Sequence, residues 1–379
     1  MNLRPLCSFL ASILLITSIS VTSGFSQATR VSFNDPAWDF AHAVESRVET
    51  YKGRESLYLE GKALLNGINF SDGVIEVDVT TPFPRAFAGL LFRTQSPTEY
   101  EEMYIRLHKS GSPDAIQYTP VFNDVAAWQL YGTGDGWGMA AFDKNEWIPL
   151  RIEVSGNQIR IFAGQSNDAI VSTHLRREDE SGGLGLWGLF GAYFSNFRFS
   201  PAEISLENLV KPDPEPGVIT NWTLSQAFRA DGVNLTEAPP EESTDWFEVK
   251  SESTGLLNLS RYLPDEDFRN MPEDGDFDAG QSAIGAYAKA IITSESDQIK
   301  KLHFGYSDNV VIILNGKPMY SGKSGFRSRD PLFQGMIGYH DAVFLNLKRG
   351  KNELVFTVTE TFGGWGVMAK FEDIMGIEF

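Results

Sequence analysis

The chain has 379 residues and carries 50 Asp and Glu against 32 Lys and Arg, a net charge of −18. This acidity argues against binding to nucleic acids or to anionic membrane surfaces, because both partners require a basic protein surface. A hydrophobic content of 42% excludes a disordered chain, and the length suits two domains that each bury a core.

Residues 1–28 have the pattern of a secretory signal peptide. Arg4 precedes an apolar run from Leu6 to Ile19, and small residues near Ala28 offer a cleavage site. The run is short for a membrane span, and an uncleaved anchor is the alternative. We therefore expect a secreted or periplasmic protein with no membrane span after signal removal. The only cysteine, Cys7, lies in this segment, so the mature chain would form no disulfide.

The remaining sequence predicts β-strands. Alternating runs such as VIEVDV (74–79), RIEV (151–154) and LVFTV (354–358) are separated by Gly, Pro, Asn and Asp. Asn315-Gly316 predicts a two-residue hairpin turn after the apolar run 310–314. Many short strands with glycine-rich turns are typical of sandwiches. We therefore predict an all-β protein of two β-sandwich (jelly-roll) domains.

A proline-rich segment separates the two predicted domains. The run KPDPEPG at 211–217 alternates proline with charged residues, which favours an extended spacer. We place the first domain at 29–200, the linker at 201–217 and the second domain at 218–379.

The most informative predicted strand covers residues 103–108. Its odd-numbered residues are apolar and would face a core. The neighbouring even-numbered residues would face the other side and are Glu102, Tyr104, Arg106 and His108. Such groups can hydrogen-bond sugar hydroxyls, with aromatic rings stacking on the sugar. The alternative is a solvated outer face with Glu102 and Arg106 as an ordinary surface pair. Further ligand-binding residues predicted downstream are Gln117, Tyr118, Asn123, Trp128, Gln129 and Tyr131.

Several segments of the first domain carry a family resemblance. AGLLFRTQ (88–95), YEEMYIRLHKSGSPDAIQYTPVFN (100–123), WQLYG (128–132), GGLGLWG (182–188) and AYFSNFRF (192–199) together resemble a concanavalin A-like (laminin-G-like) jelly roll. They are similar to the 3-keto-disaccharide hydrolase-like family of secreted bacterial proteins. The resemblance covers most of 31–200. It implies a bacterial protein that binds or processes a glycan on the concave sheet or at its rim.

Hydrolases that resemble this domain carry an E-x-D-x-x-E strand, and no such string occurs in this chain. Binding of a glycan, or of another neutral small molecule, without catalysis is therefore the leading hypothesis. The alternative is a glycoside hydrolase with Glu102 or Asp114 as acid/base and with His108 or Arg106 stabilising charge. A third hypothesis is a cell-surface adhesin that has no small-molecule site. We expect no cofactor.

The second domain resembles a galactose-binding-like jelly roll over about 218–376. The likeness lies in SDNVVIILNGKPMYSG (307–322) and GKNELVFTVTETFGGWG (350–366). Ligands of such modules usually sit in loops at one end, which points to Arg327, Arg329 and Trp365. The alternative is that the two arginines pair with local acids.

An acidic stretch in the second domain invites comparison with calcium loops. Asp274, Asp276 and Asp278 alternate as oxygen ligands of Ca²⁺ would. The glycine that follows Asp278 falls at 280 rather than directly after it, and position 285, where a closing Glu would stand, is also glycine, so the stretch is not an EF-hand. A solvated acidic loop is the favoured interpretation, and a generic Ca²⁺-binding loop is the alternative.

Overall fold

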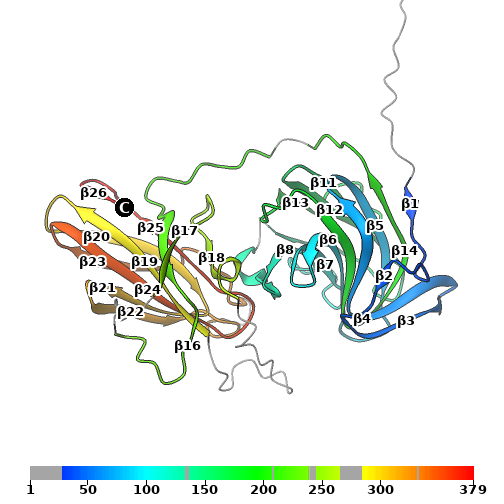
Figure 1. Ribbon diagram of the computed structural model, residues 1–379, viewed down its shortest axis with the longest axis horizontal. Coiled ribbons are helices and arrows are strands. Elements are labelled where there is room, and N and C mark those ends of the chain that lie inside the picture. Colours follow the sequence, from blue (N-terminus) through cyan, green and yellow to red (C-terminus); the bar gives the residue numbers. More distant parts are fainter. Residues whose placement is uncertain are drawn as a thin grey trace, which may run out of the picture.

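The computed structural model of the chain describes residues 28–132, 136–206, 209–237, 239, 245–264, 284–330 and 333–379. It consists of antiparallel β-sheets that form two sandwiches, as the sequence predicts (Figure 1). Residues 1–27 of the predicted signal and the acidic residues Asp274, Asp276 and Asp278 lie outside the described residues. In the described part of the chain, none of the helices has the length and apolar character to span a bilayer.

The first sandwich contains β1 to β14 and one 3-10 turn. The elements are β1 (Thr29–Arg30), β2 (Trp38–Asp39), β3 (Ala43–Tyr51), β4 (Arg54–Phe70), β5 (Gly73–Thr80), β6 (Phe87–Ser96), β7 (Glu99–Arg106), β8 (Ile116–Phe122), β9 (Val125–Ala126), η1 (Trp128–Leu130), β10 (Trp137–Gly138), β11 (Ile148–Ser155), β12 (Gln158–Ala163), β13 (Val171–His174) and β14 (Gly182–Pro201).

The long strand β14 belongs to both layers of this sandwich. Residues 183–189 pair with β6, and residues 193–201 pair with β5. The register against β4 shifts between Gly188 and Ala192, and such a bulge bends a strand from one sheet into the next. One layer therefore runs β10-β8-β7-β6-β14, and the other continues as β14-β5-β11-β12-β13.

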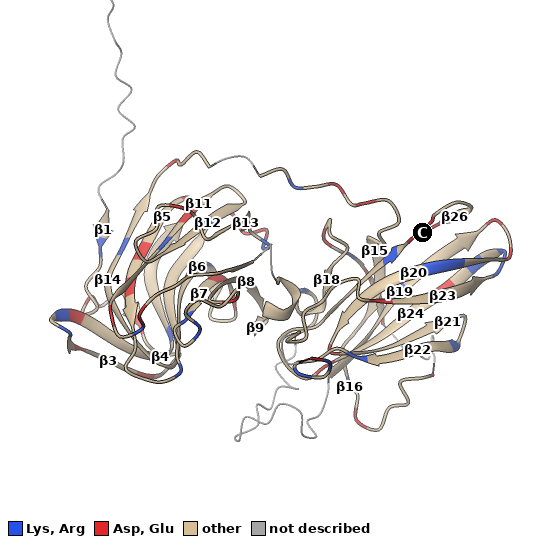
Figure 2. Cartoon of the chain, turned by 180° about the vertical axis from the view of Figure 1, so that it is seen from behind, with Lys and Arg blue, Asp and Glu red and all other residues tan. Residues whose placement is uncertain are grey.

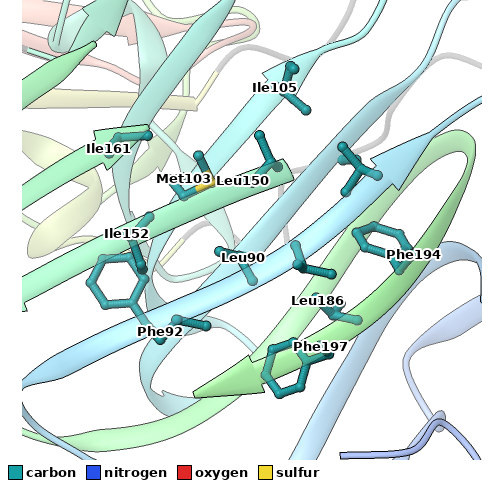
Figure 3. Packing of buried hydrophobic residues seen from close by; sticks show 14 of the residues in the cluster. Leu90, Phe92, Met103, Ile105, Leu150, Ile152, Ile161, Leu186, Phe194 and Phe197 are labelled. Atoms are coloured by element: carbon teal, nitrogen blue, oxygen red, sulfur yellow. The ribbon is translucent and has the colours of Figure 1, made fainter. Parts of the chain in front are cut away.

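The core of the first sandwich lies between these layers (Figure 3). One layer contributes side chains such as Leu90, Met103 and Ile105, and the other contributes Leu150 and Ile152. All five are at most 1% exposed. The predicted inward face of the strand at 103–108 is therefore confirmed. At about 0.8 kcal/mol per buried CH₂ group, this core stabilises the fold in the absence of cross-links.

Charged pairs cover the outer face of the second layer. Arg198 bonds Glu76 at 2.6 Å, and Arg160 bonds Glu153 at 2.6 Å. This is the ordinary solvated face of a half-buried sheet. Both signs of charge are spread over both sandwiches (Figure 2), so the net acidity is not gathered in one tail.

The second sandwich packs a larger sheet, ordered β17-β15-β19-β24-β21-β22, against the sheet β18-β25-β20-β23. The elements are β15 (Asn221–Ser225), β16 (Phe228–Arg229), β17 (Trp246–Lys250), β18 (Leu257–Asn258), η3 (Leu259–Arg261), β19 (Ile284–Ser294), β20 (Gln298–Ser307), β21 (Asn309–Leu314), β22 (Lys317–Lys323), β23 (Asp341–Leu347), β24 (Gly350–Glu360), β25 (Gly366–Phe371) and β26 (Ile377–Glu378). Asn315 and Gly316 form the predicted hairpin turn, both with positive φ.

The two sandwiches contact each other through residues that follow β8. Tyr131 donates a 2.6 Å hydrogen bond to Glu252 of the second sandwich and accepts one from Asn258 at 3.3 Å. A small apolar cluster joins Leu130 and Tyr131 to Leu256. Figure 2 shows β9 of the first sandwich and β18 of the second on the sides of the two sandwiches that face each other. The domains are thus held by specific polar and apolar contacts as well as by the linker.

Candidate functional site

A row of residues in register crosses the outer face of the β14-β6-β7-β8-β10 layer. Trp187 lies opposite Gly89, Gly89 opposite Tyr104, Tyr104 opposite Gln117, and Gln117 opposite Trp137. Residues directly opposite each other point to the same side of a sheet, so these five share one face. Gly89 has no side chain, and the ring of Trp187 lies 5.5 Å from that of Tyr104. The glycine thus allows the two rings to meet across a strand.

Phe87 is the centre of an aromatic cluster on this face. Its ring lies 6.1 Å from those of Tyr104 and Trp187 and 5.0 Å from that of His108. The Cζ atom of Arg106 lies 5.8 Å from the ring centroid of Phe87. The structure therefore brings the predicted Tyr104, Arg106 and His108 together around an aromatic ring.

Hydrogen bonds and ion pairs fix the polar groups of this cluster. The Tyr104 hydroxyl donates to Gln117 Oε1, and Arg106 forms an ion pair with Asp114. His108 Nδ1 lies 3.2 Å from the carbonyl of Ala86. Burial lowers the pKa of His108, and the nearby Arg106 lowers it further, which favours the neutral imidazole. A neutral imidazole can both donate and accept hydrogen bonds.

Glu102 is the most perturbed acid on this face. It is 2% exposed, and it lies opposite Leu91, which packs with Tyr100 and Val121. Burial raises the pKa of Glu102 to about 8, although Lys62 acts in the opposite direction. This carboxyl therefore holds a proton at neutral pH, unlike an ordinary surface glutamate.

The accessible edge of the cluster is formed by Phe190 and Arg85. Phe190 is 44% exposed and lies in the β14 bulge with a φ of 63°. The Cζ atom of Arg85 lies 4.9 Å from the ring centroid of Phe190 and 5.6 Å from that of Phe87. Exposure thus falls from Phe190 through half-buried Trp187 to buried Tyr104. We call Phe87, Tyr104, Trp187, Phe190, Arg85, Arg106 and His108 the β7 face.

The predicted segment 117–131 divides between three environments. Gln117 lies beside the β7 face, opposite Tyr104, from whose hydroxyl it accepts a hydrogen bond. Tyr118 points into the core, where its hydroxyl donates to Glu101 at 2.8 Å, because neighbours in a strand alternate sides. Asn123, Gln129 and Tyr131 contact the second sandwich, at Ser260, Gln334 and Glu252.

Trp128 lies at the junction of the two sandwiches. Its ring lies 6.2 Å from Trp137 of the first sandwich, and 6.0 and 6.1 Å from Phe326 and Phe362 of the second. Of the predicted ligand residues downstream of β8, it is the one whose side chain bridges the β10 end of the layer and the second sandwich. It therefore links the layer that carries the β7 face to the loops of the second sandwich.

The three predicted ligand residues of the second sandwich lie in different environments. Trp365 is fully buried in the core, which corrects the expectation of an exposed ring that stacks on a ligand. Packing with the core outweighs the flexibility that two preceding glycines suggest. Arg329 pairs with Asp341 and donates to Tyr306, the predicted alternative. Arg327 is exposed and lies over the ring of its neighbour Phe326, with its Cζ 4.8 Å from the ring centroid.

A pocket of about 680 Å³ opens between the sandwiches, lined by residues that include Arg93, Arg176, Arg177, Glu252 and Arg261. Its arginines already have partners. Arg177 binds Glu99 and Asp179, Arg93 donates to three backbone carbonyls and to Asp72, and Arg176 pairs with Glu252. These bonds already engage the three guanidinium groups, and the Arg176–Glu252 pair joins the two sandwiches, so the β7 face is the stronger candidate.

Within the described ranges, no three His, Cys, Asp or Glu side chains are grouped so that they could hold a metal ion. The residues that sequence reasoning missed are Phe87, Trp187, Phe190 and Arg85. Gly183, Gly185 and Trp187 alternate with Leu184 and Leu186, and this period of two was the available signal for an outward Trp187. Phe190 had no local signal, because the bulge that exposes it depends on pairing with β4.

Comparisons with known proteins give structural likenesses alone. No family model and no curated protein matches the chain. A carbohydrate-binding module from Bacillus subtilis matches with 17% identity and a TM-score of 0.34, over 42% of this chain and 93% of its own. A Bacillus subtilis protein of unknown function with a galectin-like fold matches with 9% identity and a TM-score of 0.33, over 42% and 88%. A beta-glucanase from Bacillus licheniformis matches with 14% identity and a TM-score of 0.32, over 46% and 98%. We therefore argue the function from the residues of this chain.

Proposed function

We propose that this protein binds a carbohydrate on the β7 face. The observation that carries the proposal is the graded exposure of Phe190, Trp187 and Phe87, next to Arg106 and His108. Sugars present apolar C–H faces and polar edges, so they suit a surface that combines aromatic rings with planar hydrogen-bonding groups. A solvated outer face would instead show paired charges, as β5 and β11 do.

The inner residues hold this surface in place. Gln117 and Tyr104 bond each other, and Asp114 restrains the guanidinium of Arg106. Because these side chains are already ordered, a ligand that contacts Trp187 and Arg106 does not need to immobilise them. The predicted signal peptide at 1–28 would export the protein from the cytoplasm, and extracellular glycans would then be available to it.

Hydrolysis is the second candidate, and Glu102 is the observation that favours it. A pKa of about 8 suits a general acid at neutral pH. However, Glu102 is 2% and Asp114 6% exposed, and Asp114 is bound to Arg106. A glycosidic bond cannot reach either carboxyl in this arrangement. We therefore favour binding without cleavage.

The test is binding of the purified chain to an array of neutral and acidic oligosaccharides, followed by calorimetry on the glycans retained. Trp187→Ala and Phe190→Ala should each weaken binding by roughly tenfold or more, because an aromatic contact contributes about 0.5–1.5 kcal/mol beyond its buried area. Phe344→Ala is the matched control, since Phe344 is an exposed aromatic of the second sandwich. Unchanged affinity in the first two variants, or no bound glycan, would sink the proposal. Release of smaller saccharides that stops in Glu102→Gln would favour the hydrolase.

A further inference from the structure

A second aromatic cluster lies beyond the β14 bulge, on the outer face of the other layer. The ring of Tyr193 on β14 lies 5.3 Å from that of Tyr58 on β4. It also stacks on the ring of Tyr51 at the end of β3, with the centroids 3.7 Å apart and the planes inclined by 3°. The ring of Trp147, which precedes β11, lies 6.2 Å from that of Tyr51. Because the next residue, Phe194, belongs to the core, Tyr193 points outward.

The loop between β5 and β6 joins this cluster to the β7 face. A Cβ atom added to Gly191 would lie 2.8 Å from the ring of Phe83, so this ring rests on the backbone of the bulge. The same ring lies 6.3 Å from that of Tyr58. Two residues further on, Arg85 lies against the ring of Phe190 in the β7 face. We call Arg47, Tyr51, Tyr58, Phe83, Trp147 and Tyr193 the corner face.

Aromatic rings that reach the solvent gather where the two faces meet. Phe83 is 37% and Phe190 44% exposed, and in the described part of the first sandwich they are the exposed phenylalanines. Tyr51 and Trp147 are half-buried. Single exposed apolar side chains are ordinary on a protein surface, whereas contiguous ones mark interaction sites. The two faces therefore form one accessible aromatic surface that bends around the bulge.

The loop that carries Phe83 is ordered before any ligand binds. Pro82 and Pro84 flank this residue, and each fixes its own φ angle. Thr81 Oγ1 donates to a carbonyl of the bulge at 2.9 Å and accepts a hydrogen bond from the Phe83 amide at 3.2 Å. Lys144 Nζ donates to the Phe83 carbonyl at 2.5 Å. A ring held in this way loses little conformational freedom on binding.

The corner face also presents polar groups beside its rings. The Cζ atom of Arg47 lies 3.8 Å from the ring centroid of Tyr58. Arg47 Nε donates to Glu49 at 3.0 Å, and the two side chains are 41% and 39% exposed. A guanidinium has more donors, and a carboxylate more lone pairs, than this bond uses. Because the two charges offset each other, the pair suits the hydroxyls of a neutral sugar, which both donate and accept hydrogen bonds.

We propose that the carbohydrate is an extended chain of several sugar units, which continues from the β7 face around the β14 bulge onto the corner face. This inference rests on the proposed function, because the β7 face holds one end of the chain. Trp187 and Tyr193 are six residues apart on β14, a separation of up to about 20 Å at the usual rise per residue of a strand. A single sugar ring cannot span it, so a short glycan would contact one face and a long glycan both.

The test measures affinity against chain length with the full-length protein. The glycan that the array retains is prepared as a series from monosaccharide to octasaccharide, and each member is titrated by calorimetry. We expect the affinity to rise by roughly tenfold or more between the disaccharide and the hexasaccharide, because each further aromatic contact adds to the binding free energy.

Variants then locate the longer part of the chain. Phe83→Ala and Tyr51→Ala should each lower the affinity for the hexasaccharide by roughly fivefold or more and leave that for the disaccharide unchanged. Phe83→Leu keeps an apolar side chain on the bulge without the ring and should show the same loss. Trp187→Ala should weaken the binding of both lengths. Phe344→Ala, at an exposed ring of the second sandwich, is the matched control, and thermal unfolding verifies that the variants fold.

The outcomes separate this inference from the proposed function. A disaccharide that binds as tightly as the hexasaccharide overturns the extended chain and leaves carbohydrate binding in place. A hexasaccharide affinity that is unchanged in the three corner-face variants, or a loss that is equal for both lengths, also overturns it. If no member of the series binds, the proposed function fails and the inference fails with it.

Discussion

Replacing the buried Glu102 by glutamine should change how the stability of the protein depends on pH. The folded state raises the pKa of Glu102 from 4.5 to about 8 through burial. A raised carboxyl pKa means that stability is greatest below pH 4.5, where Glu102 is protonated in both states, and is lost as pH rises through the folded value. Between pH 4.5 and about 8, each pH unit lowers the free energy of unfolding by ~1.4 kcal/mol. The wild type therefore loses about 5 kcal/mol of stability over this interval.

Glu102→Gln removes this loss, because the amide is neutral at every pH and nearly isosteric. The free energy of unfolding of the variant should match that of the wild type near pH 4.5. It should exceed the wild-type value progressively up to pH 8.5, by as much as about 5 kcal/mol. Urea unfolding followed by circular dichroism at pH 4.5, 6, 7 and 8.5 measures the difference.

The difference in unfolding free energy between Glu102→Gln and the wild type isolates the contribution of Glu102 to the pH dependence of stability. Burial also raises the pKa of Glu101 and lowers that of His108, but both groups remain in the variant and cancel. Glu146→Gln, at an exposed glutamate, is the control and should follow the wild type. A difference between Glu102→Gln and wild type that stays constant from pH 4.5 to 8.5 would refute the assignment of Glu102 as a buried, protonated acid.

Two further predictions concern the geometry of the site and of the domain contact. Gly89→Ala should destabilise the fold by about 1–3 kcal/mol and weaken glycan binding, because the new Cβ would lie 2.6 Å from the Met103 carbonyl oxygen. Gly183→Ala, whose Cβ meets nothing nearer than 3.5 Å, should do neither, and thermal unfolding with calorimetry compares them. Tyr131→Phe should loosen the contact between the sandwiches by removing the donor to Glu252, at a cost of about 1–3 kcal/mol. Faster proteolytic cutting between the sandwiches would verify this, and an unchanged cutting rate would count against it.

Local alternation explains what the sequence could predict. The faces of the strand at 103–108 follow from a period of two, and the structure places Met103 and Ile105 in the core as expected. The partners of Asn123 and Tyr131 could not be predicted, because they lie more than 100 residues further along the chain. Nor could the sequence show that Gln117 rather than Tyr118 shares a face with Tyr104, since that depends on the register between β7 and β8.

At Trp365 the sequence predicts the local turn correctly but does not predict the direction of the side chain. Two glycines before it suggest a loop, but its side chain fills the second core. The glycines take a φ of 95° each, which turns the chain so that the indole points inward. Composition identified a turn here, and tertiary packing decided the direction of the side chain.

The contact made by Tyr131 has a consequence for how the two sandwiches can be separated or recombined. The chain between β14 and β15 keeps both partners of the Tyr131–Glu252 hydrogen bond on one molecule, so their encounter is intramolecular and independent of protein concentration. An insertion in this connection lengthens the path between Tyr131 and Glu252 without removing either group, and closure entropy changes only slowly with the length of a loop. Insertions between β14 and β15 should therefore be tolerated better in engineered forms than changes at Tyr131.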